Sequence, residues 1–207
     1  LHLIYSADTH FVLTHDSSTI ADLSLFATPS TQGSDVRVRV RPSSSQSHWV
    51  VDIACRDTRA LLARLAKGLN SSGLAIVSAS LATWTDGTVV DTFAVHSQTV
   101  PIAEVIAREV RRALTARWPR RTGSHTMGLR FSVDNLLHPT HSIVTVTGQD
   151  RIGALQDIAS VLTRERIVVK HARIMTSDGR ISDRFEVCDV HGQKLSQRTT
   201  AKLHKLS

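Results

Sequence analysis

The sequence predicts an α+β protein built from two copies of one small module, each an antiparallel sheet with helices on one face. The main observation is an internal repeat that continues through two strands, a helix and a hairpin, and composition alone does not produce such a repeat. The matched pairs are Asp57 with Asp150, Leu62 with Leu155, Ala66 with Ala159, Leu69 with Leu162, Ala79 with Ala172, Thr83 with Thr176 and, after one residue is dropped at a turn, Asp91 with Asp183, Phe93 with Phe185 and Val95 with Val187.

The second observation is the order of apolar patterns along the first copy. Alternation indicates strands, and apolar residues three or four apart indicate amphipathic helices. The expected elements are a strand over 49–55, a helix over 59–71, a strand over 74–84, a tight turn at Asp86-Gly87, a strand over 89–96, a helix over 101–118 and a strand over 129–133. This order is βαββαβ, the ferredoxin-like arrangement.

The second copy repeats the pattern but stops short of a fourth strand. Its expected elements are a strand over 141–148, a helix over 153–164, a strand over 167–176, a turn at Asp178-Gly179, a strand over 180–188 and a helix from about 196. Residues 36–40 alternate valine with arginine, which is typical of a half-buried strand with its arginines in water. We expect this strand to fill the gap in the second copy. The expected domains are an N-terminal segment over 1–47 and modules over 48–135 and 136–207.

The N-terminal segment contains a short extended piece at Phe11-Val12-Leu13 and then a helix capped by Asp16 or Ser17. No apolar run approaches the ~20 residues that would cross a bilayer, so no membrane association is expected. The two cysteines, Cys55 and Cys188, are predicted to be reduced core residues of a cytoplasmic protein.

Charge and composition argue against several classes of function. The net charge of +7 favours acidic partners. However, the arginines are densest on the helix over 101–118 and just after it, and no aromatic residues are interleaved with them. A solvated helix face is therefore expected rather than a nucleic-acid surface. The histidine pairs His10/His15 and His138/His141 have no cysteine or acid at ligand spacing, so no metal site is predicted.

A binding site is predicted where the first strand of each module meets its first helix. Free amides and the positive end of a helix dipole attract a carboxylate, and a glycine lets a ligand approach the backbone. Asp150 could hold an α-ammonium group. The candidate effector-binding residues are Asp150, Arg151, Ile152, Gly153, Ala154 and Leu155 in the second module and Asp57, Thr58, Arg59, Ala60 and Leu61 in the first. Asp91 and Asp183 are interpreted as structural residues near turns.

These residues resemble the ACT domain family. Its pattern is a strand ending in Asp, then Arg-Pro-Gly-Leu-Leu and a helix, a strand ending in Ala-x-Ile-x-Thr, and Asp-x-Phe-x-Val. The second module reads Asp150-Arg151-Ile152-Gly153-Ala154-Leu155, Ala172-Arg173-Ile174-Met175-Thr176 and Asp183-Arg184-Phe185-Glu186-Val187. The junction at Phe131-Ser132-Val133-Asp134-Asn135 and the stretch 189–195 resemble the tandem ACT region of bifunctional uridylyltransferase/uridylyl-removing enzymes of nitrogen control.

The resemblance implies that the chain is the regulatory region of such an enzyme. It implies an amino-acid effector, glutamine, a PII-type signalling protein as partner of the parent enzyme, and Mg²⁺ at the parent's nucleotidyltransferase site. No Gly-Ser followed by an Asp-x-Asp metal pair occurs here, and His15-Asp16 is a lone dipeptide. We therefore expect no catalytic residues and no cofactor in this chain. Small sheets of this kind commonly pair, so a homodimer is expected.

The departures from the family pattern leave a second hypothesis open. Where the pattern has Pro-Gly, the first module has Arg59-Ala60 and the second has Ile152-Gly153. Ala60 places a methyl group where a ligand must approach the backbone. The alternative is an ACT pair that binds no effector and mediates dimerisation or contact with a protein partner. A catalytic fragment of a nucleotidyl-transferring enzyme is the other alternative.

Overall fold

The structure is a computed structural model that describes residues 16–43, 45, 47–84, 86–117 and 128–206. The extended piece expected at Phe11-Val12-Leu13 lies outside these residues. Helix α3 (Ser17–Phe26) confirms the expected N-terminal helix, with Asp16 as its N-cap: the Asp16 side chain accepts a hydrogen bond from the amide of Thr19 at 2.9 Å.

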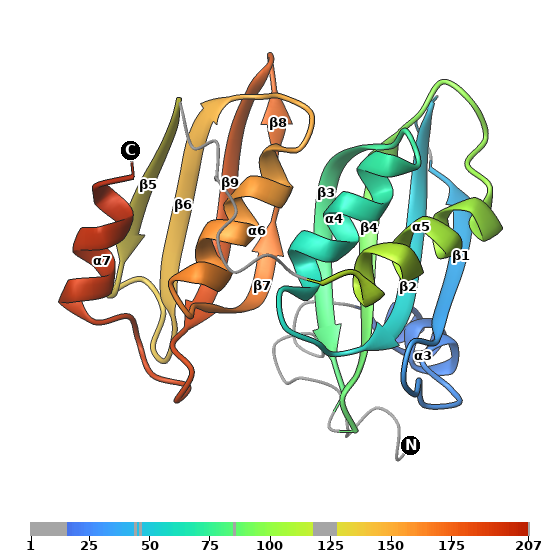
Figure 1. Cartoon of the computed structure of the whole chain (residues 1–207), viewed down its shortest axis with the longest axis horizontal. Helices are drawn as coiled ribbons and strands as arrows, with labels where there is room; N and C mark the ends of the chain where they lie inside the picture. The colour runs from blue at the N-terminus through green and yellow to red at the C-terminus, as the bar shows by residue number, and fades with distance from the viewer. Residues whose placement is uncertain (1–15, 44, 46, 85, 118–127, 207) are drawn as a thin grey trace.

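The first module contains a four-stranded antiparallel sheet in the order β1-β2-β4-β3, with two helices on one face (Figure 1). Its elements are β1 (Val36–Pro42), β2 (His48–Arg56), α4 (Leu61–Ser71), β3 (Ala75–Thr83), β4 (Thr88–His96) and α5 (Ala103–Thr115). The two helices pack closely where Gly68 meets Val110. A Cβ on Gly68 would lie only 2.8 Å from the Val110 Cα, so this close contact depends on the glycine.

The second module has the same architecture, with the sheet order β5-β6-β9-β7 and a short β8 paired to β9. Its elements are β5 (Leu129–Asp134), β6 (Ser142–Gln149), α6 (Ala154–Arg164), β7 (Val168–Arg173), β8 (Thr176–Ser177), β9 (Arg180–Cys188) and α7 (Gln197–His204). The strand expected over 167–176 is thus divided into β7 and β8. Two antiparallel sheets with helices on one face confirm the predicted fold class.

The source of the fourth strand was predicted wrongly in both modules. β1 pairs with β2 of the first module, whereas it was expected to complete the second. β5 pairs with β6 of the second module, whereas it was expected to complete the first. The expected boundary between 135 and 136 therefore falls between two paired strands of one sheet. In each module the fourth strand precedes the repeated unit in sequence, because a short connection lets neighbouring strands pair as a hairpin.

The hairpin between β5 and β6 is tied to the segment before α7. The Ser142 hydroxyl donates to the Asn135 side-chain oxygen at 2.6 Å and accepts from the amide of Leu195 at 2.8 Å. The Asn135 side-chain amide in turn donates to the carbonyl of Leu195 at 3.0 Å. Since Ser142 is fully buried, these bonds satisfy its hydroxyl and fix β5 to its own module.

The arginines of β1 do not simply face water, as the alternating pattern had suggested. Asp52 on β2 has a fully buried side chain and accepts hydrogen bonds from Arg39 at 2.9 Å and Arg41 at 3.0 Å. Arg39 also forms a bidentate pair with Asp22 of α3, at 2.9 and 2.6 Å. This charged network therefore holds α3 on the sheet face opposite α4 and α5.

The two modules lie side by side, with equivalent elements facing each other. Helix α4 contacts α6, and strand β3 at the edge of one sheet contacts β7 at the edge of the other (Figure 1). Cys55 and Cys188 are buried free thiols, as predicted. Within the described residues, no helix is long and apolar enough to cross a membrane.

Candidate ligand-binding pockets between the modules

Two pockets open at the junction, one at each end of β3. The first-module pocket, around Asp57, has a volume of about 640 Å³, and the second-module pocket, around Asp150, has a volume of about 180 Å³. Each combines the strand–helix loop of one module with the end of the first helix and the following strand of the other. A ligand in either pocket would therefore contact both modules.

The second-module pocket brings together the residues that the sequence had proposed. All six residues over 150–155 line it, and Asn70, Gly73 and Ile76 enter from the first module. Gly153 has a φ of 84°, and a Cβ placed on it would meet nothing within 4 Å, so its Cα faces open space. The Arg151 guanidinium group forms an ion pair at 2.7 Å with Asp157, in the first turn of α6.

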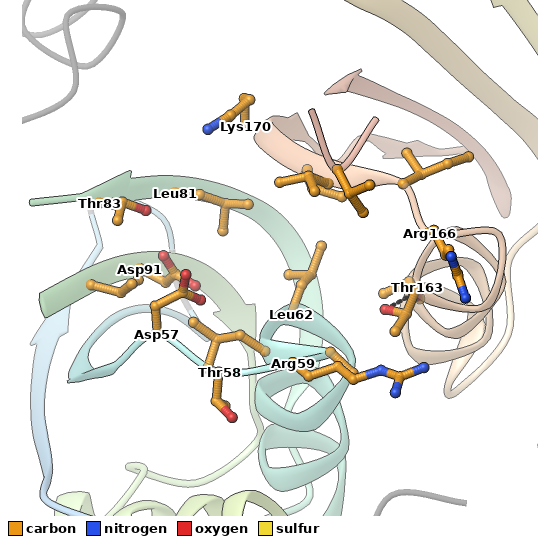
Figure 2. Close-up of a pocket in the computed structure, with 18 residues that line it drawn as sticks. Asp57, Thr58, Arg59, Leu62, Leu81, Thr83, Asp91, Thr163, Arg166 and Lys170 are labelled. Carbon is orange, nitrogen blue, oxygen red and sulfur yellow. Dashed lines mark hydrogen bonds between the residues drawn. The ribbon is translucent and has the colours of Figure 1, made fainter. Parts of the chain in front are cut away.

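The first-module pocket likewise contains all five proposed residues over 57–61 (Figure 2). The second module contributes the end of α6 and the start of β7, including Thr163, Arg166 and Lys170. In Figure 2 the carboxylates of Asp57 and Asp91 lie next to each other on one side of this space. The sequence had predicted the loops but not the residues that face them from the other module.

Asp91 and Asp183, which the sequence indicated to be structural residues near turns, line the two candidate pockets. Asp91 lines the first-module pocket and Asp183 the second, although only 2% and 1% of their surfaces are exposed. Burial, together with the negative charge of Asp150, raises the pKa of Asp183 to about 7. Burial raises the pKa of Asp91 well above its usual range, and Asp57 adds to that shift. The one sign in the sequence that these two aspartates share a role is that they occupy equivalent positions in the repeat.

Each buried carboxyl accepts a hydrogen bond from a backbone amide. The amide of Met175 donates to Asp183 Oδ1 at 3.1 Å, and the amide of Ala82 donates to Asp91. Among the described residues, the Oδ1 atom of Asp91 is buried without a hydrogen-bond partner. A buried carboxyl that lacks a counter-ion is costly to ionise, so each pocket favours a cationic group on its ligand.

The helices that begin at the two pockets are not capped by side chains. Ala60 and Gly153 occupy the N-cap positions of α4 and α6, both in the left-handed conformation, and neither provides a capping side chain. Of the helices away from the pockets, α3 and α7 are capped by Asp16 and Ser196, whereas α5 also begins without a side-chain cap. Each pocket thus combines an uncapped helix start, which suits a carboxylate, with buried acids, which suit an ammonium group.

Ala60 adopts a φ of 61°, where its equivalent Gly153 carries no Cβ. A left-handed alanine costs ~1–2 kcal/mol, part of which is offset by the smaller chain entropy of unfolded alanine. We expect Ala60→Gly to raise the free energy of unfolding by about 0.5–1 kcal/mol in urea titrations. The reciprocal Gly153→Ala should lower it by about 1 kcal/mol. Equal effects of the same sign would contradict this assignment.

A group of side chains that could hold a metal gathers at the β5–β6 hairpin. Although the sequence showed no acid beside His138 and His141, the fold brings Glu186 of β9 to them, with candidate ligand atoms within 4.8 Å of one another. However, His138 Nδ1 accepts hydrogen bonds from the amides of His141 at 2.9 Å and Thr140 at 3.3 Å. The proton of the neutral ring therefore lies on Nε2, which faces Glu186, so this donor set does not fit a metal.

Comparison with protein families agrees with this geometry. The ACT domain family model matches residues 142–207. A second model, described as the ACT-like domain of plant bHLH transcription factors, matches residues 37–116 and thus includes β1 in the first module. The second module thus matches the ACT domain family, and the first matches an ACT-like family. No solved structure matches it significantly.

Particular relatives share most of this chain. It is 31% identical to the bifunctional uridylyltransferase/uridylyl-removing enzyme of Rhodospirillum rubrum, over 84% of this chain and 20% of that protein. It is 30% identical to the enzyme of the same name from Azospirillum brasilense, over 82% of this chain and 21% of that protein. The chain is therefore similar to a segment of these enzymes and spans about a fifth of their length.

Proposed function

We propose that this ACT pair is the amino-acid-sensing regulatory region of a uridylyltransferase-like nitrogen-control enzyme, with glutamine bound in the second-module pocket. The observation that carries the proposal is the composition of that pocket. It combines an open Gly153 at an uncapped helix start with the acidic pair Asp150 and Asp183. These groups match the carboxylate and ammonium of an α-amino acid.

The choice of glutamine has support from the opposite side of the pocket. Asn70 of α4 lines it, and its carboxamide can both donate and accept hydrogen bonds. A ligand carboxamide would complement Asn70 better than an aliphatic or charged side chain. The volume of about 180 Å³ also suits a single amino acid rather than a drug-sized molecule.

Regulation would follow from the position of the pocket between the modules. A ligand that contacts both modules favours their side-by-side arrangement, and a differential affinity worth ~1–3 kcal/mol is enough for an allosteric switch. In this proposal the parent enzyme acts on a PII-type signalling protein, and any Mg²⁺ serves its nucleotidyl transfer. A homodimer is proposed through β1 or β5, the outer strands of the two sheets.

Calorimetric titration with L-glutamine, with glycine and L-leucine as controls, tests the sensor. We expect saturable binding at ~0.1–1 mM, equivalent to roughly −4 to −5.5 kcal/mol, and selective for glutamine. Gly153→Leu should abolish it, because the side chain would enter the pocket. Gly192→Leu is the matched control, since Gly192 also has a positive φ and open space but lies outside both pockets.

The alternative is an ACT pair that acts as an effector-independent scaffold for dimerisation or a protein partner. It is favoured if no amino acid binds or stabilises the wild-type chain. A loss of binding in Gly192→Leu equal to that in Gly153→Leu would show an unfolding effect rather than a site, and would remove the support for the second-module pocket.

A further inference from the structure

The two pockets differ in charge at structurally equivalent positions. The turn after α4 contains Gly73, with a φ of 76°, and the turn after α6 contains Arg166, with a φ of 60°. The amide of Gly73 bonds to the carbonyl of Asn70 and that of Arg166 to the carbonyl of Thr163, so the two turns have the same hydrogen-bond pattern. An arginine thus occupies a left-handed position that glycine adopts without strain.

A basic residue also takes the place of an apolar one at two further pairs of equivalent positions. Ile152 in the loop of the second-module pocket corresponds to Arg59 in the first. Both edge strands carry a bulge at the same point, where Val77 in β3 corresponds to Lys170 in β7. The first-module pocket therefore has three basic side chains where the equivalent positions for the second are apolar or glycine.

Neither Arg59 nor Arg166 has a counter-ion within the part of the chain that the structure describes. No described residue forms an ion pair or a side-chain hydrogen bond with either guanidinium group, whereas Arg151 at the other pocket pairs with Asp157. Figure 2 shows the two side chains on the same side of the pocket, Arg59 from the first module and Arg166 from the second. Two guanidinium groups, one from each module, suit a bidentate anion such as a carboxylate.

The same pocket also retains the acidic pair found in its counterpart. Asp57 and Asp91 lie together on the opposite side from the arginines (Figure 2). Asp91 is almost fully buried, and its Oδ1 atom has no partner among the described residues. The pocket can therefore accept a cationic group at one side and an anionic group at the other.

We propose, building on the ligand-binding role assigned above, that the first-module pocket binds an acidic amino acid. Its α-ammonium group would lie at Asp57 and Asp91, its α-carboxylate at the start of α4, and its side-chain carboxylate at Arg59 and Arg166. Because the pocket of about 640 Å³ is larger than its counterpart, it has room for the additional carboxylate and its water. The two pockets then distinguish an acidic amino acid from its neutral relatives.

The test is calorimetric titration of L-glutamate, L-glutamine and succinate into the wild type and the double variant Arg59→Ile/Arg166→Gly. These substitutions install the residues of the second-module pocket, and the glycine relieves a left-handed arginine, so the fold should persist in thermal unfolding. We expect glutamate affinity to fall by about tenfold or more, since charge-assisted bonds to a carboxylate are lost. Arg111→Ala/Arg117→Ala, which removes two exposed arginines outside both pockets, is the control for the same change in net charge.

Gly153→Leu separates this inference from the glutamine assignment. Glutamate binding that survives Gly153→Leu but is lost in the double variant supports the acidic-ligand pocket, even if glutamine binds nowhere. The inference is overturned if glutamate binds the double variant as tightly as the wild type, or does not bind the wild type. It is also overturned if succinate, which has no ammonium group, binds as tightly as glutamate.

Discussion

Asp183→Asn is expected to stabilise the chain strongly at pH 8 and by less than half as much at pH 5. The pKa of Asp183 is raised to about 7 in the fold, against an ordinary value of 3.8. The folded state therefore binds more protons than the unfolded state between these values, and its stability falls as the pH rises through this window. Above pH 7 the penalty reaches about 4 kcal/mol, at 1.36 kcal/mol for each pH unit.

Urea unfolding of both proteins at pH 5, 6.5 and 8 measures this effect. The substituted carboxamide keeps an oxygen to accept the Met175 amide but carries no charge, so the variant should lose the part of the decline that Asp183 causes. Asp189→Asn is a suitable control: backbone hydrogen bonds lower the pKa of Asp189, which is therefore ionised at both pH 5 and pH 8. A wild-type stability that is flat from pH 5 to 8 would contradict a buried, unpaired carboxylate at Asp183.

The cost of ionising Asp183 has a functional consequence. A carboxyl that destabilises the empty fold at neutral pH becomes favourable when a ligand ammonium group lies beside it. Ligand affinity should therefore rise with pH up to about 7, and Asp183→Asn should lose both the affinity and its pH dependence. A structural residue near a turn would show neither effect in calorimetry, which distinguishes the two interpretations of this aspartate.

Gly148→Ala is expected to be the most disruptive single-methyl substitution in the second sheet. Gly148 of β6 lies opposite Leu129 of β5, and a Cβ on it would be 2.5 Å from the carbonyl oxygen of Gly128 and 2.9 Å from the Leu129 side chain. Backbone cannot move aside as a flexible side chain can, so the strands must separate. We expect a loss of about 2–3 kcal/mol in the free energy of unfolding.

Gly192→Ala is the control, because it adds the same methyl group at a positive φ with nothing within 4 Å. It should cost about 1 kcal/mol from backbone strain alone. Hydrogen exchange should show that Gly148→Ala lowers protection in β5 and β6 together and leaves β1 and β2 unchanged. Loss of protection in the first module instead would contradict the assignment of β5 to the second sheet.

Much of the fold was predictable because local patterns and the repeat specify it. The repeat alone indicated that Phe93 and Phe185 occupy equivalent core positions, and both side chains are fully buried. The loops at Asp57 and Asp150 were also predictable, because a strand followed by an uncapped helix start with a nearby glycine or alanine is a local feature. Each of these depends on residues that are close together in the chain.

The partner of β1, and the residues that complete the pockets, could not be predicted in this way. The sequence alone established two copies of one module, the order of their elements and the loop that contributes to each pocket. Only the tertiary structure decided that β1 and β5 each complete the sheet of the unit that follows them. It also placed Asp91 and Asp183 inside the pockets and Arg166 opposite Arg59 across the junction. The physical reason is that strand pairing and module packing bring together residues that are distant in sequence. Hydrophobic periodicity indicates which face of an element is buried, but it does not indicate which element covers that face.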